Sequence, residues 1–257
     1  MNYKDVREQL IWNLRLDFDP VGVRFVYDEN EIPKLPVTHK AKVKICYCQF
    51  LAAARQSRMA LFMPPEKLLC DNADLVFGFR DLEEKGDAKR HMKYLVDENL
   101  SLEAAKQKPK LKKGCKGIYM APLDFFDKTE YKPDLMFAIC TPYQAYHIMN
   151  DYMGAMNRPN LTFFHTPNSA VCAGSVYAHN NQTANLTTMC AGSKTSGKTE
   201  MAYVNVFIPG DHIFPLIERQ KMRCEKGGPS VLGKGYQPWP GLDVCKGCPL
   251  FRFEAVE

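Results

Sequence analysis

The sequence predicts an α/β fold, in which a mixed sheet with flanking helices forms one compact domain; a mixed α+β arrangement is the alternative. Helical periodicity alternates along the chain with short apolar runs. The run Leu-Met-Phe-Ala-Ile-Cys, which ends at Cys140, is apolar throughout and is typical of a strand buried on both faces. Neither a repeat nor a linker divides residues 1–226, so we expect one domain there, with an irregular Gly- and Pro-rich, Cys-containing tail over 227–257 packed on it.

The first half of the chain contains three predicted helices and two predicted strands. Val6, Leu10 and Leu14 recur at helical spacing, and Asp17-Phe-Asp-Pro20 ends this first helix. The third helix is expected to be interrupted near Asn99, where Ser101 would be a new N-cap. The predicted helices span 3–16, 43–59 and 87–106, and the predicted strands span 21–27 and 116–122, with a loop over 28–36.

The second half continues the alternation. Thr141 and Pro142 are suited to the N-cap and the first position of a helix over 143–156. The remaining predicted elements are strands at 134–140, 161–165 and 203–208, a helical or mixed segment at 170–178, and a helix at 211–225.

Composition indicates a soluble globular protein of the cytoplasm. Hydrophobic residues make up 46% and charged residues 25% of the 257 residues, and the formal net charge is +5. The first residues contain no apolar signal segment, and no apolar stretch is long enough to cross a bilayer, so we expect no membrane partner. The basic run from Lys106 to Lys116 is interpreted as a solvated loop rather than a nucleic-acid surface, because no aromatic residues interleave with it.

Ten cysteines favour reduced thiols or metal ligands over disulfides, as in the cytoplasm of an anaerobe. The motif Cys245-Lys-Gly-Cys248-Pro249 is typical of iron–sulfur and zinc sites. A metal there needs further ligands, and Cys224 is the nearest candidate in the sequence. The alternative is a pair of free thiols in an irregular tail.

Five upstream cysteines are also considered as possible ligands. Cys46 and Cys48 point apart if both lie on a helix, so Cys48 is preferred as a ligand. Cys70 follows a Pro-Pro turn, and core packing is its alternative role. Cys-Ala-Gly-Ser occurs at both Cys172 and Cys190, where small residues allow backbone amides to approach an anion or a cluster sulfide; two unrelated tight turns are the alternative.

The sequence is compatible with two other kinds of cofactor site. Residues 192–199 match the phosphate-loop string, which makes Gly192, Ser193 and Lys194 candidate cofactor contacts, although a strand before and a helix after the motif are missing from the pattern. A haem or another small cofactor could be bound between helix 143–156 and the segment from Cys172 to Cys190. That helix has a stripe of soft side chains, which is also typical of a core: Tyr146, His147, Met149, Met153 and Met156.

Three segments resemble the ArCR-type family of unknown function, which is found in bacteria and archaea, often anaerobes. They are Cys48-Gln-Phe-Leu-Ala-Ala-Ala, the run from Cys70-Asp-Asn-Ala to Gly78, and the paired Cys172 and Cys190 segments that continue to Glu200-Met201 and Pro209. The resemblance implies a shared site built from cysteines and does not imply a reaction.

The leading hypothesis is an iron–sulfur protein, most simply with a four-iron cluster, that serves electron transfer, cofactor maturation or sensing. Its partner would be a redox protein, and a homo-oligomer is compatible with the sequence. A structural zinc site, the haem-type pocket and a nucleotide-binding enzyme are the alternatives, and the sequence does not decide whether the protein is an enzyme. The predicted metal ligands are Cys245 and Cys248, with Cys48, Cys70, Cys190 and Cys224 as candidates for the remaining places.

Overall fold

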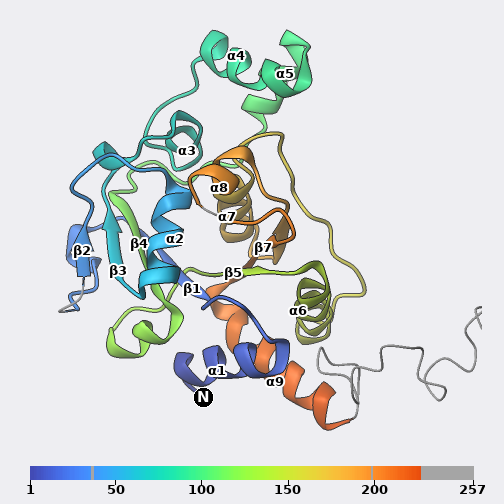
Figure 1. Cartoon of the computed structure of the whole chain (residues 1–257). Helices are drawn as coiled ribbons and strands as arrows, with labels where there is room; N and C mark the ends of the chain where they lie inside the picture. Colours follow the sequence, from blue (N-terminus) through green and yellow to red (C-terminus); the bar gives the residue numbers. More distant parts are fainter. Residues whose placement is uncertain (36–37, 198, 227–257) are drawn as a thin grey trace, which may run out of the picture.

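A mixed sheet runs through the computed structural model, which describes residues 1–35, 38–197 and 199–226 (Figure 1). In the described residues its strand order is β2-β3-β4-β1-β5-β7-β6, and β2 pairs with β3 in parallel while all other neighbours are antiparallel. The strands are β1 (Val21–Val26), β2 (Thr38–Lys40), β3 (Ala60–Met63), β4 (Gly117–Pro122), β5 (Leu135–Cys140), β6 (Asn185–Thr187) and β7 (Val204–Pro209).

Helices cover both faces of this sheet. The described helices are α1 (Tyr3–Leu14), α2 (Tyr47–Ser57), α3 (Asp71–Val76), α4 (Glu84–Leu95), α5 (Glu98–Lys106), α6 (Pro142–Ala155), α7 (Ala170–Asn181), α8 (Ala191–Thr195) and α9 (Ile213–Glu225). Residues of α1, α6 and α9 pack in one core cluster, and residues of α2, α3 and α7 pack in another on the opposite face. The predicted class, a mixed sheet with flanking helices, is confirmed.

Strand β5 shows how the sequence produces two cores. Phe137 and Ile139 belong to the core under α2 and α7, whereas Met136 and Ala138 belong to the core under α6 and α9. Successive side chains of a strand point to opposite faces, so a strand between two helical layers must be apolar at every position. The prediction of a buried central strand is therefore confirmed.

Several predicted boundaries were wrong for local reasons. The helix expected from residue 43 begins at Tyr47, because the backbone of Ile45 is instead bonded to Lys67 and Leu69. The helix expected over 87–106 is interrupted, but Asp97 caps α5 through the Leu100 N–H at 2.7 Å, and Ser101 lies buried inside that helix.

The segment 161–165 is not a strand. The backbone N–H of Phe164 donates to Asn185 Oδ1 at 2.9 Å, and its carbonyl accepts from Asn185 Nδ2 at 3.3 Å. A side chain thus satisfies the backbone that a neighbouring strand would otherwise bind. The short elements β2, β3, β6, α3 and α8 were not predicted.

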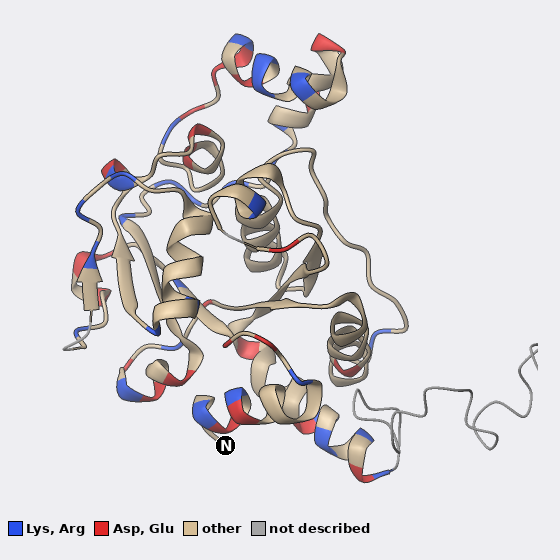
Figure 2. Cartoon of the chain, in the orientation of Figure 1, with Lys and Arg blue, Asp and Glu red and all other residues tan. Residues whose placement is uncertain are grey.

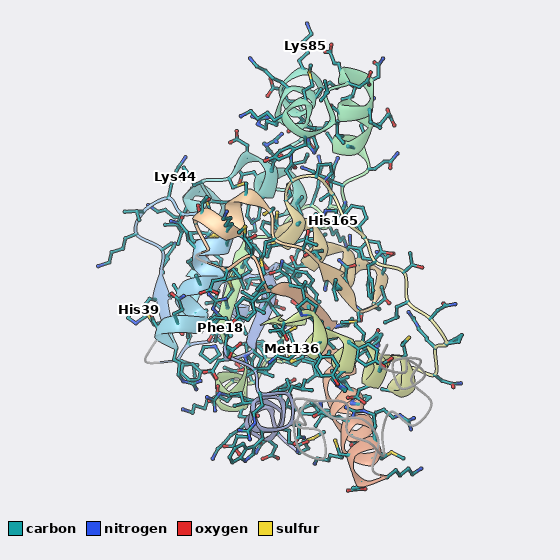
Figure 3. All side chains as sticks on the ribbon, turned by 45° about the vertical axis from the view of Figure 1, so that its right-hand side comes forward. Phe18, His39, Lys44, Lys85, Met136 and His165 are labelled. Atoms are coloured by element: carbon teal, nitrogen blue, oxygen red, sulfur yellow. The ribbon has the colours of Figure 1, made fainter. Side chains whose placement is uncertain are left out.

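Helices α4 and α5 form a pair that projects from the body, with Lys85 on the outer part of that projection (Figure 3). Lys, Arg, Asp and Glu are interspersed on this pair, while α2, α7 and the strands carry few charges (Figure 2). Within the described ranges, no helix has both the length and the apolar character needed to cross a bilayer. The predicted tail, with Cys245 and Cys248, lies outside the described residues.

Candidate metal centre

Five cysteines from four separate segments come together at the starts of four helices. Cys46 is the N-cap of α2 and Cys48 lies in its first turn, Cys70 is the N-cap of α3, Cys172 is in the first turn of α7, and Cys190 is the N-cap of α8. Helices α2, α3, α7 and α8 lie together beneath the projecting pair, and α7 contacts both α2 and α3 (Figure 1). These five residues are called the cysteine site below.

Electrostatic and packing contacts connect all five thiols. Cys48, Cys70 and Cys190 pack against the core cluster that contains Cys172. The pKa of Cys46 is raised by burial and by the nearby Cys70 and Cys190 thiols. Burial also raises the pKa of Cys172, and Cys70 and Cys190 add to that effect. The site therefore concentrates sulfur in one place, where Cys172 is buried and the other four cysteines are half-buried.

Local backbone chemistry explains why helices begin at these cysteines. The Cys46 N–H donates to Gln49 Oε1 at 2.9 Å, which satisfies a backbone group at the start of α2. At α8, the Cys190 carbonyl accepts from the Ser193 hydroxyl at 2.8 Å and from the Lys194 N–H at 3.1 Å. First-turn N–H groups have no partner inside their helix, so they are available to a negatively charged sulfur.

Cys48 and Cys190 form a thiol–thiolate pair. The hydrogen bond from the Cys48 thiol, together with donors on Ser193 and the backbone N–H of Val171, lowers the pKa of Cys190 to about 5. The same bond and burial raise the pKa of Cys48 well above its usual value. The two pKa shifts thus have opposite directions, and both favour the thiolate form at Cys190 over Cys48.

A buried lysine completes the site. Lys108 Nζ donates to Asn72 Oδ1 at 3.1 Å, to Asn168 Oδ1 at 2.5 Å and to Ser169 Oγ at 2.9 Å. Burial lowers the pKa of Lys108 to about 8, and the Cys172 and Cys70 thiols are among the groups that oppose this shift. The predicted solvated loop therefore turns one of its lysines inward, toward the cysteines.

Gly197 allows α8 to lie close to α2. A Cβ on Gly197 would stand 2.7 Å from the carbonyl oxygen of Ser193 and 3.1 Å from Cys48 Cβ. Only a residue without a side chain fits between these two segments without displacing one of them. This close approach holds Cys190 beside Cys48.

Residues 192–199 do not form the arrangement of a phosphate loop in the described part of the chain. Helix α8 begins at Ala191, so the helix lies inside the motif instead of following it. Ser193 is buried and its hydroxyl lies 3.5 Å from Cys190 Sγ, while Lys194 is exposed. Gly192 and Ser193, predicted as cofactor contacts, thus lie in the first turn of α8 beside Cys190, and Lys198 lies outside the described residues.

Cys224, another predicted ligand, is not brought to the cysteine site. It is exposed at the end of α9, which packs on α1 and α6 over the opposite face of the sheet. Three of the predicted metal ligands, Cys48, Cys70 and Cys190, do lie together. Cys172 joins them, and its shared Cys-Ala-Gly-Ser string with Cys190 was the signal for it; no sequence signal indicated Lys108.

The helix proposed to line a haem-type pocket lies on the other side of the sheet. Met149 of α6 is buried in the core formed with α9, whereas α7 and Cys172 belong to the opposite core. Of the two histidines near Cys172 in sequence, His165 is exposed on a coil (Figure 3). His179 lies near the far end of α7, with its ring against Phe25.

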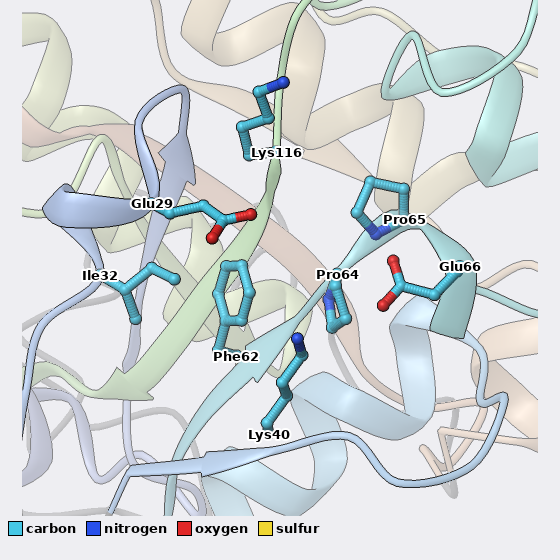
Figure 4. A pocket seen from close by; sticks show the side chains of 8 residues that line it. All are labelled: Glu29, Ile32, Lys40, Phe62, Pro64, Pro65, Glu66 and Lys116. Carbon is cyan, nitrogen blue, oxygen red and sulfur yellow. The ribbon is translucent and has the colours of Figure 1, made fainter.

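Within the described ranges, no three His, Cys, Asp or Glu side chains have the arrangement that holds one metal ion. Two cavities lie at the β2–β3 edge, and neither is lined by a cysteine. One, of about 290 Å³, has Glu29, Lys40, Glu66 and Lys116 around Phe62 (Figure 4). The other, of about 660 Å³, lies between β2 and α2. Neither cavity therefore coincides with the cysteine site.

The Cys190 thiolate should be visible in the metal-free protein. We expect the first step of a thiolate absorbance titration to have a midpoint near pH 5, because Cys48 and Ser193 donate to that sulfur. Cys48→Ala removes the strongest donor and should move the step to higher pH, and Cys190→Ala should remove it. A first step at the ordinary thiol pKa in the unaltered protein would contradict the hydrogen-bonded pair.

Comparison with known proteins identifies the family of the chain. Residues 9–219 match the family described as uncharacterised ArCR, a domain of unknown function. No curated protein and no solved structure matches the chain. Because the matched range covers most of the sequence and includes all five residues of the cysteine site, the chain belongs to the uncharacterised ArCR family.

Proposed function

We propose that the cysteine site binds a four-iron iron–sulfur cluster and that the protein transfers single electrons to or from a redox partner protein. The ligands would be Cys48, Cys70, Cys172 and Cys190, with Cys46 as a fifth thiol beside them. The observation that supports this most strongly is the meeting of cysteines from four separate segments. Iron–sulfur clusters of this type are held by four cysteine thiolates.

The ionisation of the site suits thiolate ligation. Metal binding requires deprotonated sulfur, and the depressed pKa of Cys190 supplies one thiolate at neutral pH. Bound iron would remove the remaining thiol protons, as metals do for coordinating thiols. The first-turn N–H groups of α2 and α7, at the positive ends of those two helices, would favour the resulting negative charge.

Four thiolates also suit a single zinc ion, which is the alternative occupant of the site. One zinc ion draws four sulfurs to about 2.3 Å from a common point. A four-iron cluster instead places each thiolate at a different corner of a cube, so the sulfurs stand farther apart. The iron, sulfide and zinc analysis described below distinguishes these two occupants.

Full ligation points to electron transfer. Four cysteines can saturate a four-iron cluster, which leaves no iron open to a substrate. Backbone and side-chain donors, such as the Ser193 hydroxyl beside Cys190, would adjust the reduction potential.

The test is an absorption spectrum with iron, sulfide and zinc analysis on protein purified anaerobically. We expect broad visible absorption and about four iron and four acid-labile sulfide per chain. Alanine at any one of Cys48, Cys70, Cys172 or Cys190 should remove most of the iron and the colour. Colourless protein with one zinc per chain would support the structural zinc alternative and rule out the iron–sulfur cluster.

Two other cysteines provide matched controls. Cys140→Ala alters a buried thiol on the opposite face of the sheet, and Cys224→Ala alters an exposed one. Both variants should retain the iron content of the unaltered protein. Cys245→Ser combined with Cys248→Ser should also retain it, because the body of the protein holds enough thiols; loss of iron there would assign ligands to the tail, as the sequence predicted.

A further inference from the structure

Lys108 is a buried lysine within an exposed basic run. Its side chain is 3% exposed, whereas Lys106 and Lys110 are exposed. The run is fastened on both sides: the Leu111 N–H donates to the Val76 carbonyl at 2.9 Å, and Asn180 Nδ2 donates to the Lys110 carbonyl at 2.8 Å. The chain is thereby held between α3 and α7, and the Lys108 ammonium is directed into the gap between them.

The ammonium is bonded only to neutral oxygens. Its three acceptors are Asn72 and Asn168 side-chain carbonyls and the Ser169 hydroxyl. Asn72 lies two residues after Cys70, and Ser169 lies three residues before Cys172. None of the described hydrogen-bond partners is a carboxylate, so the Asp87 carboxylate and the Cys172 and Cys70 thiols act on this ammonium through their charge and not through a hydrogen bond.

A buried cation of this kind is costly unless an anion compensates it. Every thiolate-ligated four-iron cluster is an anion, and one-electron reduction adds one more negative charge to it. A fixed positive charge at the cluster therefore stabilises the reduced form more than the oxidised form. Net charge around a cluster is one of the factors that set its reduction potential.

We propose that Lys108 raises the reduction potential of the iron–sulfur cluster, as a positioning residue that acts through its charge and binds no iron. This inference rests on the proposed function of the cysteine site. In the step concerned, the oxidised cluster accepts one electron from a one-electron donor; no bond is made to Lys108, and Lys108 keeps its proton.

The experiment compares the cluster-loaded Lys108→Met, Lys108→Gln and Lys108→Arg variants with the unaltered protein, by titration with dithionite in the presence of mediator dyes. Lys110→Met is the control, because its exposed side chain belongs to the same segment. We expect Met and Gln at position 108 to lower the equilibrium constant for cluster reduction about tenfold, a shift of about 59 mV for one electron. Lys108→Arg should retain most of the potential, and Lys110→Met all of it.

Iron and sulfide content is measured on every sample first. Unaltered protein without a cluster would refute the proposed function itself. A loaded Lys108→Met protein with an unchanged potential would overturn the assignment of Lys108 while leaving the proposed function in place. Failure of all three Lys108 variants to fold or to load, with Lys110→Met loading normally, would also overturn it, because Lys108 would then be needed for the site to form.

Discussion

Asp87→Ala is expected to lower the free energy of unfolding by about 3 kcal/mol, because it removes a fully buried carboxylate and leaves two half-buried arginines without their partner. Asp87 is fully buried and accepts from Arg80 Nη1 at 2.8 Å, from Arg80 Nη2 at 2.6 Å and from Arg90 Nη1 at 3.1 Å. It also accepts from the Glu83 N–H at 2.9 Å. Chemical denaturation of the variant and the unaltered protein measures the difference.

The loss of stability in Asp87→Ala should extend to the cysteine site. Arg80 Nε donates to the Asp71 carbonyl at 3.0 Å, and Arg90 donates to the Asp71 carboxylate at 2.7 Å. Asp71 is the first residue of α3 and follows Cys70 directly. Because both arginines are positioned by Asp87, we expect its removal to loosen this helix start and to speed the loss of any iron bound there.

The pKa of Asp87 determines how the stability lost in Asp87→Ala depends on pH. Although burial alone would raise it, the bonds from Arg80 and the Glu83 N–H lower the pKa of Asp87 below its usual value. A lowered carboxyl pKa contributes stability above the unfolded-state pKa of about 4, and this contribution is lost as the pH falls through the folded-state value. The difference between Asp87→Ala and the unaltered protein should therefore shrink in acid.

Asp81→Ala is the control for this experiment. Asp81 pairs with Lys113 at 2.9 Å, but both side chains are 83% exposed. Exposed ion pairs contribute little to stability, so this variant should unfold like the unaltered protein. Equal stability of Asp87→Ala and Asp81→Ala would show that the buried network does not hold α4 to α3.

Side-chain periodicity was enough to predict the long elements but not the short ones. Helix α6 was recognisable from Thr141 and Pro142, and the structure shows the full capping box with Gln144. Strands β2 and β6 have three residues each, which is too short for alternation to be distinguished from chance. Their place depends on neighbours in the sheet, which a local pattern does not contain.

The cysteine site illustrates the same limit. Motifs identified Cys48, Cys70 and Cys190 separately. These three residues come together only because α7 packs against α2 and α3 and because α8 packs against α2. Lys108 could not be distinguished from its basic neighbours, because its burial follows from the long-range bond between Leu111 and Val76. Sequence thus predicted the residue types of the site, and the topology determined which of them meet.

Gly210→Ala is expected to lower the free energy of unfolding by about 3 kcal/mol and the Tm by roughly 6 to 12 °C, through overpacking against backbone. A Cβ on Gly210 would overlap the carbonyl oxygen of Pro133. The adjacent Gly210 N–H donates to the Asp134 carbonyl at 2.8 Å, so the two backbones are already joined. Thermal unfolding followed by circular dichroism measures the effect.

Pro133 has no freedom to retreat from the added methyl group. The next residue, Asp134, donates its N–H to the Val23 carbonyl at 2.8 Å and accepts from the Phe25 N–H at 2.7 Å. Any movement of this segment away from β7 therefore breaks bonds that join β5 to β1. Since β5 carries side chains into both cores, the cost cannot be confined to one surface loop.

Gly86→Ala makes the same chemical change where the neighbour can move. A Cβ there would meet the Glu83 carboxylate at 2.6 Å, and that side chain is exposed and can rotate away. Gly86 lies inside α4, where alanine is the better helix former, so the free energy of unfolding of this variant should rise by about 0.5 to 1 kcal/mol. If Gly210→Ala instead unfolded at the same temperature as the unaltered protein, the junction of β5, β7 and β1 would be able to open without cost, and the rigid backbone contact at Pro133 would be refuted.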